Sequence, residues 1–203
     1  MMAKRWLVWL LPLIIALGGC TSLRSPAGKG DYYLFPFEND LEGWAAKGVD
    51  LGKPPVTWSI TRSGEMVKGG KSAVIFDLTN LNTQANIWLE RSFPLEPGQR
   101  YRVQVAYDFA SADRSGVNPW RLITGVAPAP FGGSDDLVYQ GDTGNGPGSA
   151  AGYQWLGKAY DFVVQANADG HVYAAIGIRG NGEAQRHYFL DNVRITFTRD
   201  TPP

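Results

Sequence analysis

The first residues that could do chemistry lie in a short acidic stretch, F-P-F-E-N-D-L-E-G-W, at positions 35–44. Its carboxylates, Glu38, Asp40 and Glu42, stand between aromatic residues on both sides. Carboxylates at the edge of an apolar run are typical of a solvated surface turn. They also suit a hard cation such as Ca²⁺, which prefers oxygen ligands. The stretch alone allows either interpretation.

A further carboxylate, Asp191, has unusual neighbours in the last predicted strand, residues 187–198. Period-two alternation places it on one face with four apolar residues, Phe189, Val193, Ile195 and Phe197. An unpaired buried charge is costly, so such groups are normally paired or bound to a metal. A β-bulge could turn Asp191 outward, it could pair with a Lys or Arg, or it could bind a cation with oxygens from elsewhere.

Catalytic motifs are scarce in this sequence. It contains no G-x-S-x-G elbow, no H-E-x-x-H and only one cysteine. The two histidines, His171 and His187, each begin a predicted strand, which is typical of surface residues at strand ends. The carboxylates of Asp135, Asp136 and Asp142 could serve glycoside hydrolysis, but they lie in a predicted loop, where acidic residues are usually solvated. We therefore expect no enzyme, with a glycoside hydrolase as the remaining alternative.

The elements that would position these side chains are short strands. The clearest is 100–109, in which Tyr101, Val103, Val105 and further aromatic residues alternate strictly with polar ones. Turn signals rich in Gly, Pro, Asn and Asp separate the candidates, and no long segment has helical periodicity. The sequence predicts an all-β fold, an antiparallel β-sandwich of jelly-roll type. The predicted strands are 32–37, 56–62, 72–79, 85–93, 100–109, 120–126, 137–140, 153–164, 171–179 and 187–198.

The N-terminal segment indicates an export signal. Lys4 and Arg5 precede a twelve-residue apolar stretch, 6–17, which is too short to span a bilayer and typical of a signal peptide. It ends in Leu-Gly-Gly-Cys, which resembles a bacterial lipobox, so we expect lipidation at Cys20. Residues 1–19 are then the signal peptide and 20–30 a lipidated Cys and flexible tether; 31–199 form the sandwich and 200–203 a tail.

Charge and cysteine content narrow the classes of partner. Without Lys4 and Arg5, 17 basic residues remain against 19 acidic ones, and no basic stripe is present, which excludes a typical nucleic-acid-binding surface. With one cysteine, the domain has no internal disulfide. Thr21 follows Cys20, and the absence of Asp there favours the outer membrane over inner-membrane retention. We expect a cell-envelope protein on a lipid anchor.

Four motifs together resemble carbohydrate-binding modules with a galactose-binding-like jelly roll. Phe-Glu followed by Gly-Trp resembles their opening strand, and a Gly-containing turn into a strand resembles their next landmark. A Pro-Gly turn precedes a strand, and an aromatic-aromatic-Leu-Asp-Asn-Val closing strand ends the domain. The resemblance covers most of residues 33–198, and the motifs stand at 37–44, 69–74, 97–103 and 188–193.

This resemblance implies a structural calcium where the first and last strands meet. Glu38 matches the family's Phe-Glu carboxylate and Asp191 its closing aspartate. Backbone carbonyls near Gly70 or Lys71 are then expected to contribute ligands. Asp40 and Glu42 match no family position, and a solvated turn is the expectation for both.

Aromatic side chains supply the candidate binding surface. Sugar-binding sandwiches stack a pyranose ring on Trp or Tyr and bond its hydroxyl groups with polar side chains. The candidate ligand residues are Trp120, Trp155, Tyr139, Trp88, Arg121 and Gln154. Trp88 is out of phase with its apolar neighbours and is expected to face outward. Aromatic residues in sandwiches are, however, mostly core.

The resulting expectation is a membrane-anchored, non-catalytic lipoprotein that recognises a carbohydrate or an envelope polysaccharide. The alternative is an envelope protein–protein contact or accessory subunit that uses the same fold without sugar binding, since a fold does not determine function.

Overall fold

A computed structural model describes residues 31–52, 56–80, 85–111, 120–142, 153–180 and 184–200. The described residues form eleven strands and one short 3₁₀ helix, η1 (Ser134–Asp136). Among them no helix is long and apolar enough to cross a membrane. Cys20, the signal peptide and the tether lie outside the described residues, so those assignments stay predictions.

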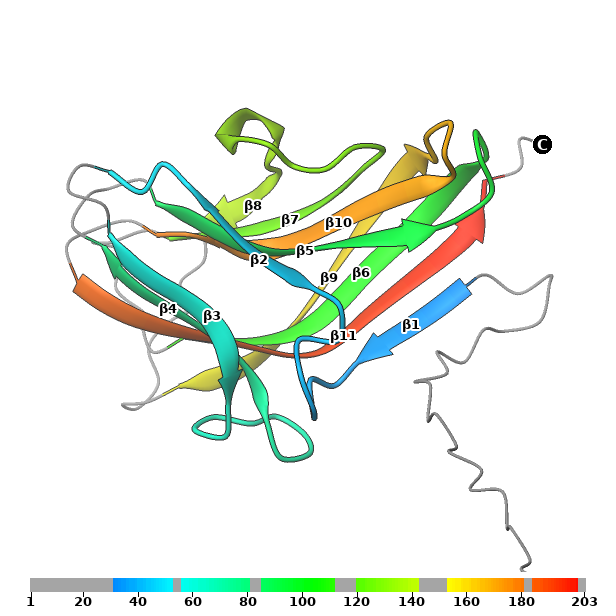
Figure 1. Cartoon of the computed structure of the whole chain (residues 1–203). Coiled ribbons are helices and arrows are strands. Elements are labelled where there is room, and N and C mark those ends of the chain that lie inside the picture. The colour runs from blue at the N-terminus through cyan, green and yellow to red at the C-terminus, as the bar shows by residue number, and fades with distance from the viewer. Residues whose placement is uncertain are drawn as a thin grey trace, which may run out of the picture.

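The strands form two antiparallel sheets that pack face to face (Figure 1). Sheet A has the order β3-β4-β11-β6-β9, and β1 also pairs with β11. Sheet B has the order β2-β5-β10-β7-β8. The strands of sheet A are β1 (Asp31–Phe35), β3 (Thr57–Ser63), β4 (Ala73–Asn80), β6 (Arg100–Ser111), β9 (Gln154–Gln165) and β11 (Ala184–Arg199). Those of sheet B are β2 (Ala45–Val49), β5 (Asn86–Pro94), β7 (Arg121–Ala127), β8 (Tyr139–Asp142) and β10 (His171–Arg179).

This architecture confirms the predicted all-β antiparallel sandwich. All ten predicted strands are present, with ends within about three residues of the expected ones. The strand that the sequence did not reveal is β2, whose residues A-A-K-G-V lack a clear apolar alternation. It lies at the edge of sheet B and buries little, so its pattern carries little information.

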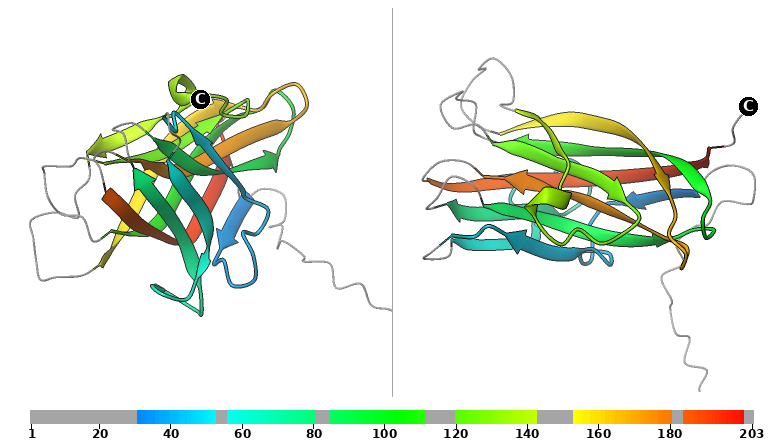
Figure 2. Two further views of the ribbon diagram at one scale, coloured as in Figure 1. Left: turned by 60° about the vertical axis from the view of Figure 1, so that its left-hand side comes forward. Right: turned by 90° about the horizontal axis from the view of Figure 1, so that it is seen from above.

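Strand β11 organises sheet A because three strands pair with it. On one side it pairs with β6 along almost its whole length. On the other side its first half pairs with β4 and its second half with β1. The strands β1 and β4 therefore lie end to end, with β1 ending opposite Val193 and β4 beginning near Leu190. The start of β1 and the end of β11 lie at the same end of the sandwich (Figure 2).

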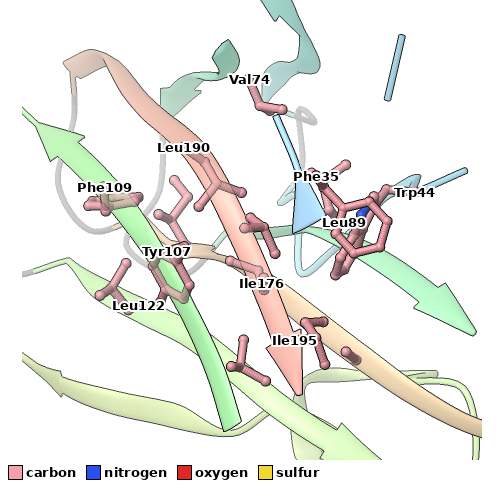
Figure 3. Close-up of a cluster of buried hydrophobic side chains, with 14 of the residues drawn as sticks. Phe35, Trp44, Val74, Leu89, Tyr107, Phe109, Leu122, Ile176, Leu190 and Ile195 are labelled. Carbon is pink, nitrogen blue, oxygen red and sulfur yellow. The ribbon is translucent and has the colours of Figure 1, made fainter. Parts of the chain in front are cut away.

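The core lies between the sheets and is rich in aromatic rings (Figure 3). At one end, Phe35 packs edge to face against Trp44, with ring centroids 5.4 Å apart. At the other end, Trp120 contacts Phe109 and Tyr188 at centroid distances of 5.3 and 5.2 Å. Because Trp120 is only 1% exposed, its indole fills core volume between the sheets.

Replacing Trp120 with alanine should therefore destabilise the fold. The change removes a large buried ring and leaves a cavity, which costs about 3–5 kcal/mol. Urea unfolding, monitored by far-ultraviolet circular dichroism and not by tryptophan fluorescence, measures the loss of unfolding free energy. The matched substitution Trp155→Ala, on a partly exposed ring, should cost clearly less. Equal costs for the two variants would contradict this placement of Trp120.

Candidate functional site

The outer face of sheet B, turned away from the core, carries a group of aromatic and polar side chains. Strand register aligns Lys47, Trp88 and Tyr139 across β2, β5 and β8 in one row. An adjacent row aligns Asn86, Arg179 and Arg121. We call this surface the sheet-B face; its residues are Lys47, Asn86, Trp88, Glu90, Arg121, Tyr139 and Arg179.

Tyr139 is the aromatic side chain at the centre of this polar group. Its hydroxyl donates to Asn86 Oδ1 at 3.0 Å, and Asn86 Nδ2 donates to Asp50 Oδ2 at 3.1 Å. The Arg179 guanidinium carbon lies 5.3 Å from the centroid of the tyrosine ring. Burial raises the pKa of Tyr139, so the hydroxyl stays protonated at neutral pH. The arrangement fixes one half-buried aromatic ring among donors and acceptors.

An ion pair extends the same face toward β2. Lys47 Nζ lies 2.6 Å from Glu90 Oε1, and Glu90 is 7% exposed. The other carboxylate oxygen of Glu90 accepts the backbone N–H of Phe131 at 2.9 Å. The buried carboxylate is therefore satisfied by one cation and one backbone donor, as a buried charge requires.

The segment between β7 and β8 lies over part of the sheet-B face (Figure 1). Its residues Phe131 and Leu137 are buried against Trp88. The Asp136 carboxylate accepts the backbone N–H groups of Gly132 and Gly133, which holds the turn into η1. Beneath this segment Trp88 is 2% exposed, and its indole N–H has no hydrogen-bond partner among the described residues.

The structure separates the six sequence-predicted ligand residues. Tyr139 and Arg121 lie on the sheet-B face. Trp88 also points to this outer face, as predicted, but it is not accessible there, because Phe131 and Leu137 cover it.

The other three predicted ligand residues lie elsewhere. The prediction of Trp120 as a ligand platform is wrong, since the ring is in the core. Trp155 and Gln154 stand on β9, an edge strand of sheet A, where Trp155 packs on Phe189 and Ala110.

Sequence reasoning missed Asn86 and Arg179 as neighbours of Tyr139, and Lys47 as a further member of the same face. Each belongs to a different strand of sheet B, so only the register brings them together. The available signal was Arg179 at the end of the predicted strand 171–179, where a charged residue follows an apolar run. Of the loop carboxylates considered for hydrolysis, Asp136 is engaged in its own turn and Asp135 is exposed.

A second candidate site lies on the other side of the molecule, where β1 ends and β4 begins. We call it the acidic corner; it consists of Glu38, Asp191 and the turn at residues 68–71. The register of β6 and β11 shifts between Asp191 and Arg194, so β11 contains one extra residue, and Asn192 has a φ of 52°. This bulge places both Leu190 and Val193 in the core and turns Asp191 to the outer face of sheet A. The structure thus shows the first of the three interpretations of Asp191.

The carboxylates of Glu38 and Asp191 hold one turn, residues 68–71. Asp191 Oδ2 accepts the backbone N–H groups of Lys68 and Gly69, both at 3.0 Å. The Glu38 carboxylate accepts the backbone N–H of Lys71 at 3.0 and 3.1 Å. Gly70 has a φ of 70°, and a Cβ there would lie 1.6 Å from Glu38 Oε1, so this position requires glycine.

The corner brings together two of the predicted calcium ligands. Glu38 and Asp191 meet on the turn that contains Gly70 and Lys71, as the resemblance implies. Asp191 is 0% exposed, and burial raises its pKa, because the charged form is poorly solvated. Within the described residues no group of three or more His, Cys, Asp and Glu is placed to hold a metal, so any cation here would need backbone carbonyls as well.

The remaining carboxylates of the acidic stretch, Asp40 and Glu42, lie near the cationic side chain of Arg91 on sheet B. The Arg91 guanidinium lies 4.7 Å from the Phe35 ring centroid and is close enough to Glu42 and Asp40 to be attracted by both. Burial raises the pKa of Glu42, opposed by backbone hydrogen bonds and by Arg91. The expectation of a solvated turn fits Asp40, which is exposed, but not Glu42, which is partly buried.

The Asp191 hydrogen bonds predict a stability effect. Asp191→Ala leaves the N–H groups of Lys68, Gly69 and Asn192 without their acceptor, which should cost about 2–4 kcal/mol of unfolding free energy. Limited proteolysis should then cut the 64–71 connection faster. Asp40→Ala, in the same corner but exposed, should change either measurement little. An unchanged unfolding free energy in Asp191→Ala would contradict the assigned role.

Comparison with known proteins identifies the fold. No protein-family model matches the sequence, and no curated protein matches it. Among solved structures, the N-terminal CBM22-1–CBM22-2 tandem domain of Paenibacillus barcinonensis Xyn10C is 17% identical, over 88% of this chain and 49% of that one, with a TM-score of 0.51. This chain shares the β-sandwich fold of that structure.

Two further solved structures are similar to this chain. The K1 cleaved adhesin domain of Lys-gingipain from Porphyromonas gingivalis W83 is 13% identical, over 82% of this chain and 98% of that one, with a TM-score of 0.51. The CBM22-1 xylan-binding domain from P. barcinonensis Xyn10C is 15% identical, over 85% and 98%, with a TM-score of 0.49. At these identities the likeness establishes the β-sandwich fold and nothing finer.

Proposed function

We propose that this chain is a non-catalytic, lipid-anchored binding protein of the cell envelope that recognises a carbohydrate through the sheet-B face. The observation that carries the proposal is the Tyr139 ring, which has the Arg179 guanidinium over one face and donates its hydroxyl to the Asn86 amide. An aromatic face with polar groups around its edge matches a pyranose ring, which is apolar on its faces and hydroxyl-rich at its rim.

The residues of the sheet-B face would have different roles in binding. Tyr139 supplies the stacking surface, while Arg179 and Arg121 can donate to sugar oxygens from the adjacent row. Lys47 is only partly exposed and lies at the opposite end of the row from Tyr139, next to Trp88. The buried Asn86–Asp50 hydrogen bond positions the amide that accepts from Tyr139, so the ring is already oriented before a ligand binds.

The fold comparison supports a binding role over catalysis. The tandem CBM22 domain that shares the fold belongs to a class named for carbohydrate binding. The sheet-B face holds Glu90 already in an ion pair with Lys47 and bonded to Phe131, so this carboxylate is not free to act as an acid or base. Anchoring through Cys20 to the outer membrane would keep the bound polysaccharide close to the envelope.

Loss of the stacking ring provides the direct test. Tyr139→Ala and Arg179→Ala should each weaken binding of the best oligosaccharide from a glycan array by about tenfold, the loss of one good aromatic or charged contact. Isothermal titration with purified protein measures the affinities. Trp155→Ala, on sheet A, is the matched aromatic control and should bind as the unaltered protein does. If no glycan binds and envelope crosslinking instead recovers a protein partner, the accessory-subunit alternative replaces this proposal.

We also propose a structural Ca²⁺ at the acidic corner, held by Glu38 and Asp191 with carbonyl oxygens of the turn that contains Gly70 and Lys71. Two carboxylates, Glu38 from the segment after β1 and Asp191 from the last strand, converge on one turn there. A bound divalent cation would compensate the charge of the fully buried Asp191. Its contribution is to stability, because it would join the ends of β1 and β4 to β11.

The pKa of Asp191 determines the pH at which calcium should matter. Its folded-state pKa lies above the unfolded value, so stability declines as pH rises through that raised pKa and the carboxylate ionises. A cation that binds the ionised form offsets this decline. The rise in melting temperature on adding calcium to chelator-treated protein should therefore be larger at pH 7 than at pH 4, and Asp191→Asn should remove most of it. Equal melting curves with calcium and with chelator at pH 7 would overturn the calcium proposal.

A further inference from the structure

A groove of about 550 Å³ lies on the outer face of sheet A, on the opposite side of the sandwich from the sheet-B face. It runs over β11, β6 and β9 near the end of the sandwich where β1 begins. This volume is within the range of small-molecule sites. We call it the sheet-A groove; its outward side chains are Arg102, Gln104, Asp161, Val163, Thr196 and Thr198.

Strand register builds the groove from two parallel rows. Thr198, Arg102 and Val163 lie side by side in one row. Thr196, Gln104 and Asp161 form the next. Both rows stand on β6, the central strand of the three, so the backbone holds them at a fixed spacing. Three strands therefore present polar groups toward one shared volume.

The polar groups are oriented and retain unused bonding capacity. Gln104 Nε2 donates to Asp161 Oδ1 at 3.2 Å, which leaves the amide oxygen and the second carboxylate oxygen open. Arg102 Nε donates to Asp200 Oδ1 at 2.8 Å, which leaves its terminal amino groups. In the described part of the chain, the hydroxyl groups of Thr196 and Thr198 have no hydrogen-bond partner. The groove offers donors and acceptors in similar number.

Apolar surface borders these polar rows. Val163 lies in the groove and is 51% exposed. Tyr32 on β1 is 46% exposed and lies next to Thr196 in the register. Two exposed apolar groups beside a ladder of hydroxyl, amide, carboxylate and guanidinium groups match a ligand with apolar ring faces and polar edges.

The charges on the groove decide the class of ligand. Arg102 and Asp161 have opposite signs within the groove, and the charge of Arg102 is itself paired with Asp200. An anionic ligand would be repelled by Asp161, and a cationic one by Arg102. A sugar hydroxyl donates and accepts at once and needs no net charge. We propose that the sheet-A groove is a second ligand site, specific for a neutral oligosaccharide segment.

Two sites on opposite faces would let one molecule hold two chains, or two segments of one chain. Because the sites face away from each other, a short oligosaccharide occupies only one of them, whereas a polysaccharide network is bridged. Binding to a polymer should then exceed binding to a hexasaccharide through avidity. The proposal of a site in the sheet-A groove rests on the groove itself and does not need the sheet-B face to bind; bridging needs both sites.

The test is an NMR titration of the full chain in detergent micelles with xylohexaose, cellohexaose and, as an acidic comparison, tetragalacturonate. At least one neutral hexasaccharide should shift the backbone amides of residues 102–104, 161–163 and 196–198. These shifts should persist in Tyr139→Ala, which removes the stacking ring of the other face. No shift in the groove with either neutral sugar, or shifts that vanish in Tyr139→Ala, overturns the second site.

Matched variants separate the groove from its surroundings. Thr198→Val removes one groove hydroxyl and should weaken neutral-sugar binding by about threefold or more, whereas Thr61→Val makes the same change on exposed β3 and should not. Asp161→Asn removes the anionic wall and should raise binding of tetragalacturonate. Stronger binding of tetragalacturonate than of the neutral sugars by the unaltered protein would overturn the assigned specificity. Groove shifts that persist while Tyr139→Ala leaves all affinities unchanged would support this site and count against the sheet-B face.

Discussion

The break in pairing along one side of β11 is the constraint on which the sandwich depends. Where β1 ends and β4 begins, the backbone of β11 near Asp191 and Asn192 loses its regular partner on that side. Buried backbone groups without partners are costly. The turn at 68–71 lies against this break, where the carboxylates of Asp191 and Glu38 accept its N–H groups, and Asp191 also accepts the N–H of Asn192. The bulge at Asn192 keeps apolar residues in the core on both sides of the gap.

The same corner also connects the two sheets. Ser72 Oγ donates to the Phe37 carbonyl at 2.7 Å, and Arg62 donates to the Asn39 carbonyl. From sheet B, Arg91 reaches Phe35 and the acidic residues that follow β1. Carboxylates that looked like excess charge in the sequence therefore divide between turn N–H groups on one side and a partly buried guanidinium on the other.

Alternation within single strands predicts most of the fold, whereas the composition of the candidate site depends on the register between strands. Strands such as β6 were recognisable because each one alternates strictly, a property of residues close in sequence. The bulge was undecidable because alternation assigns Asp191 to the core face until one extra residue reverses the phase. Trp120 and Trp155 were equivalent as aromatic residues near loops; only packing shows that one is enclosed by Phe109 and Tyr188. The cover over Trp88 comes from residues some forty positions away, which no short window of sequence contains.

Pairing of the first and last described strands has a consequence for how the chain acquires its structure. Strand β11 supplies partners to β1, β4 and β6, so before it arrives these three strands present open edges. Contacts between such distant segments form slowly, because a long loop must close first. A chain synthesised from its N-terminus would thus remain an incomplete sheet with unpaired edges until its final strand was made. Protection of those edges until then, by a chaperone or by rapid completion of residues 184–199, would raise the yield of folded protein.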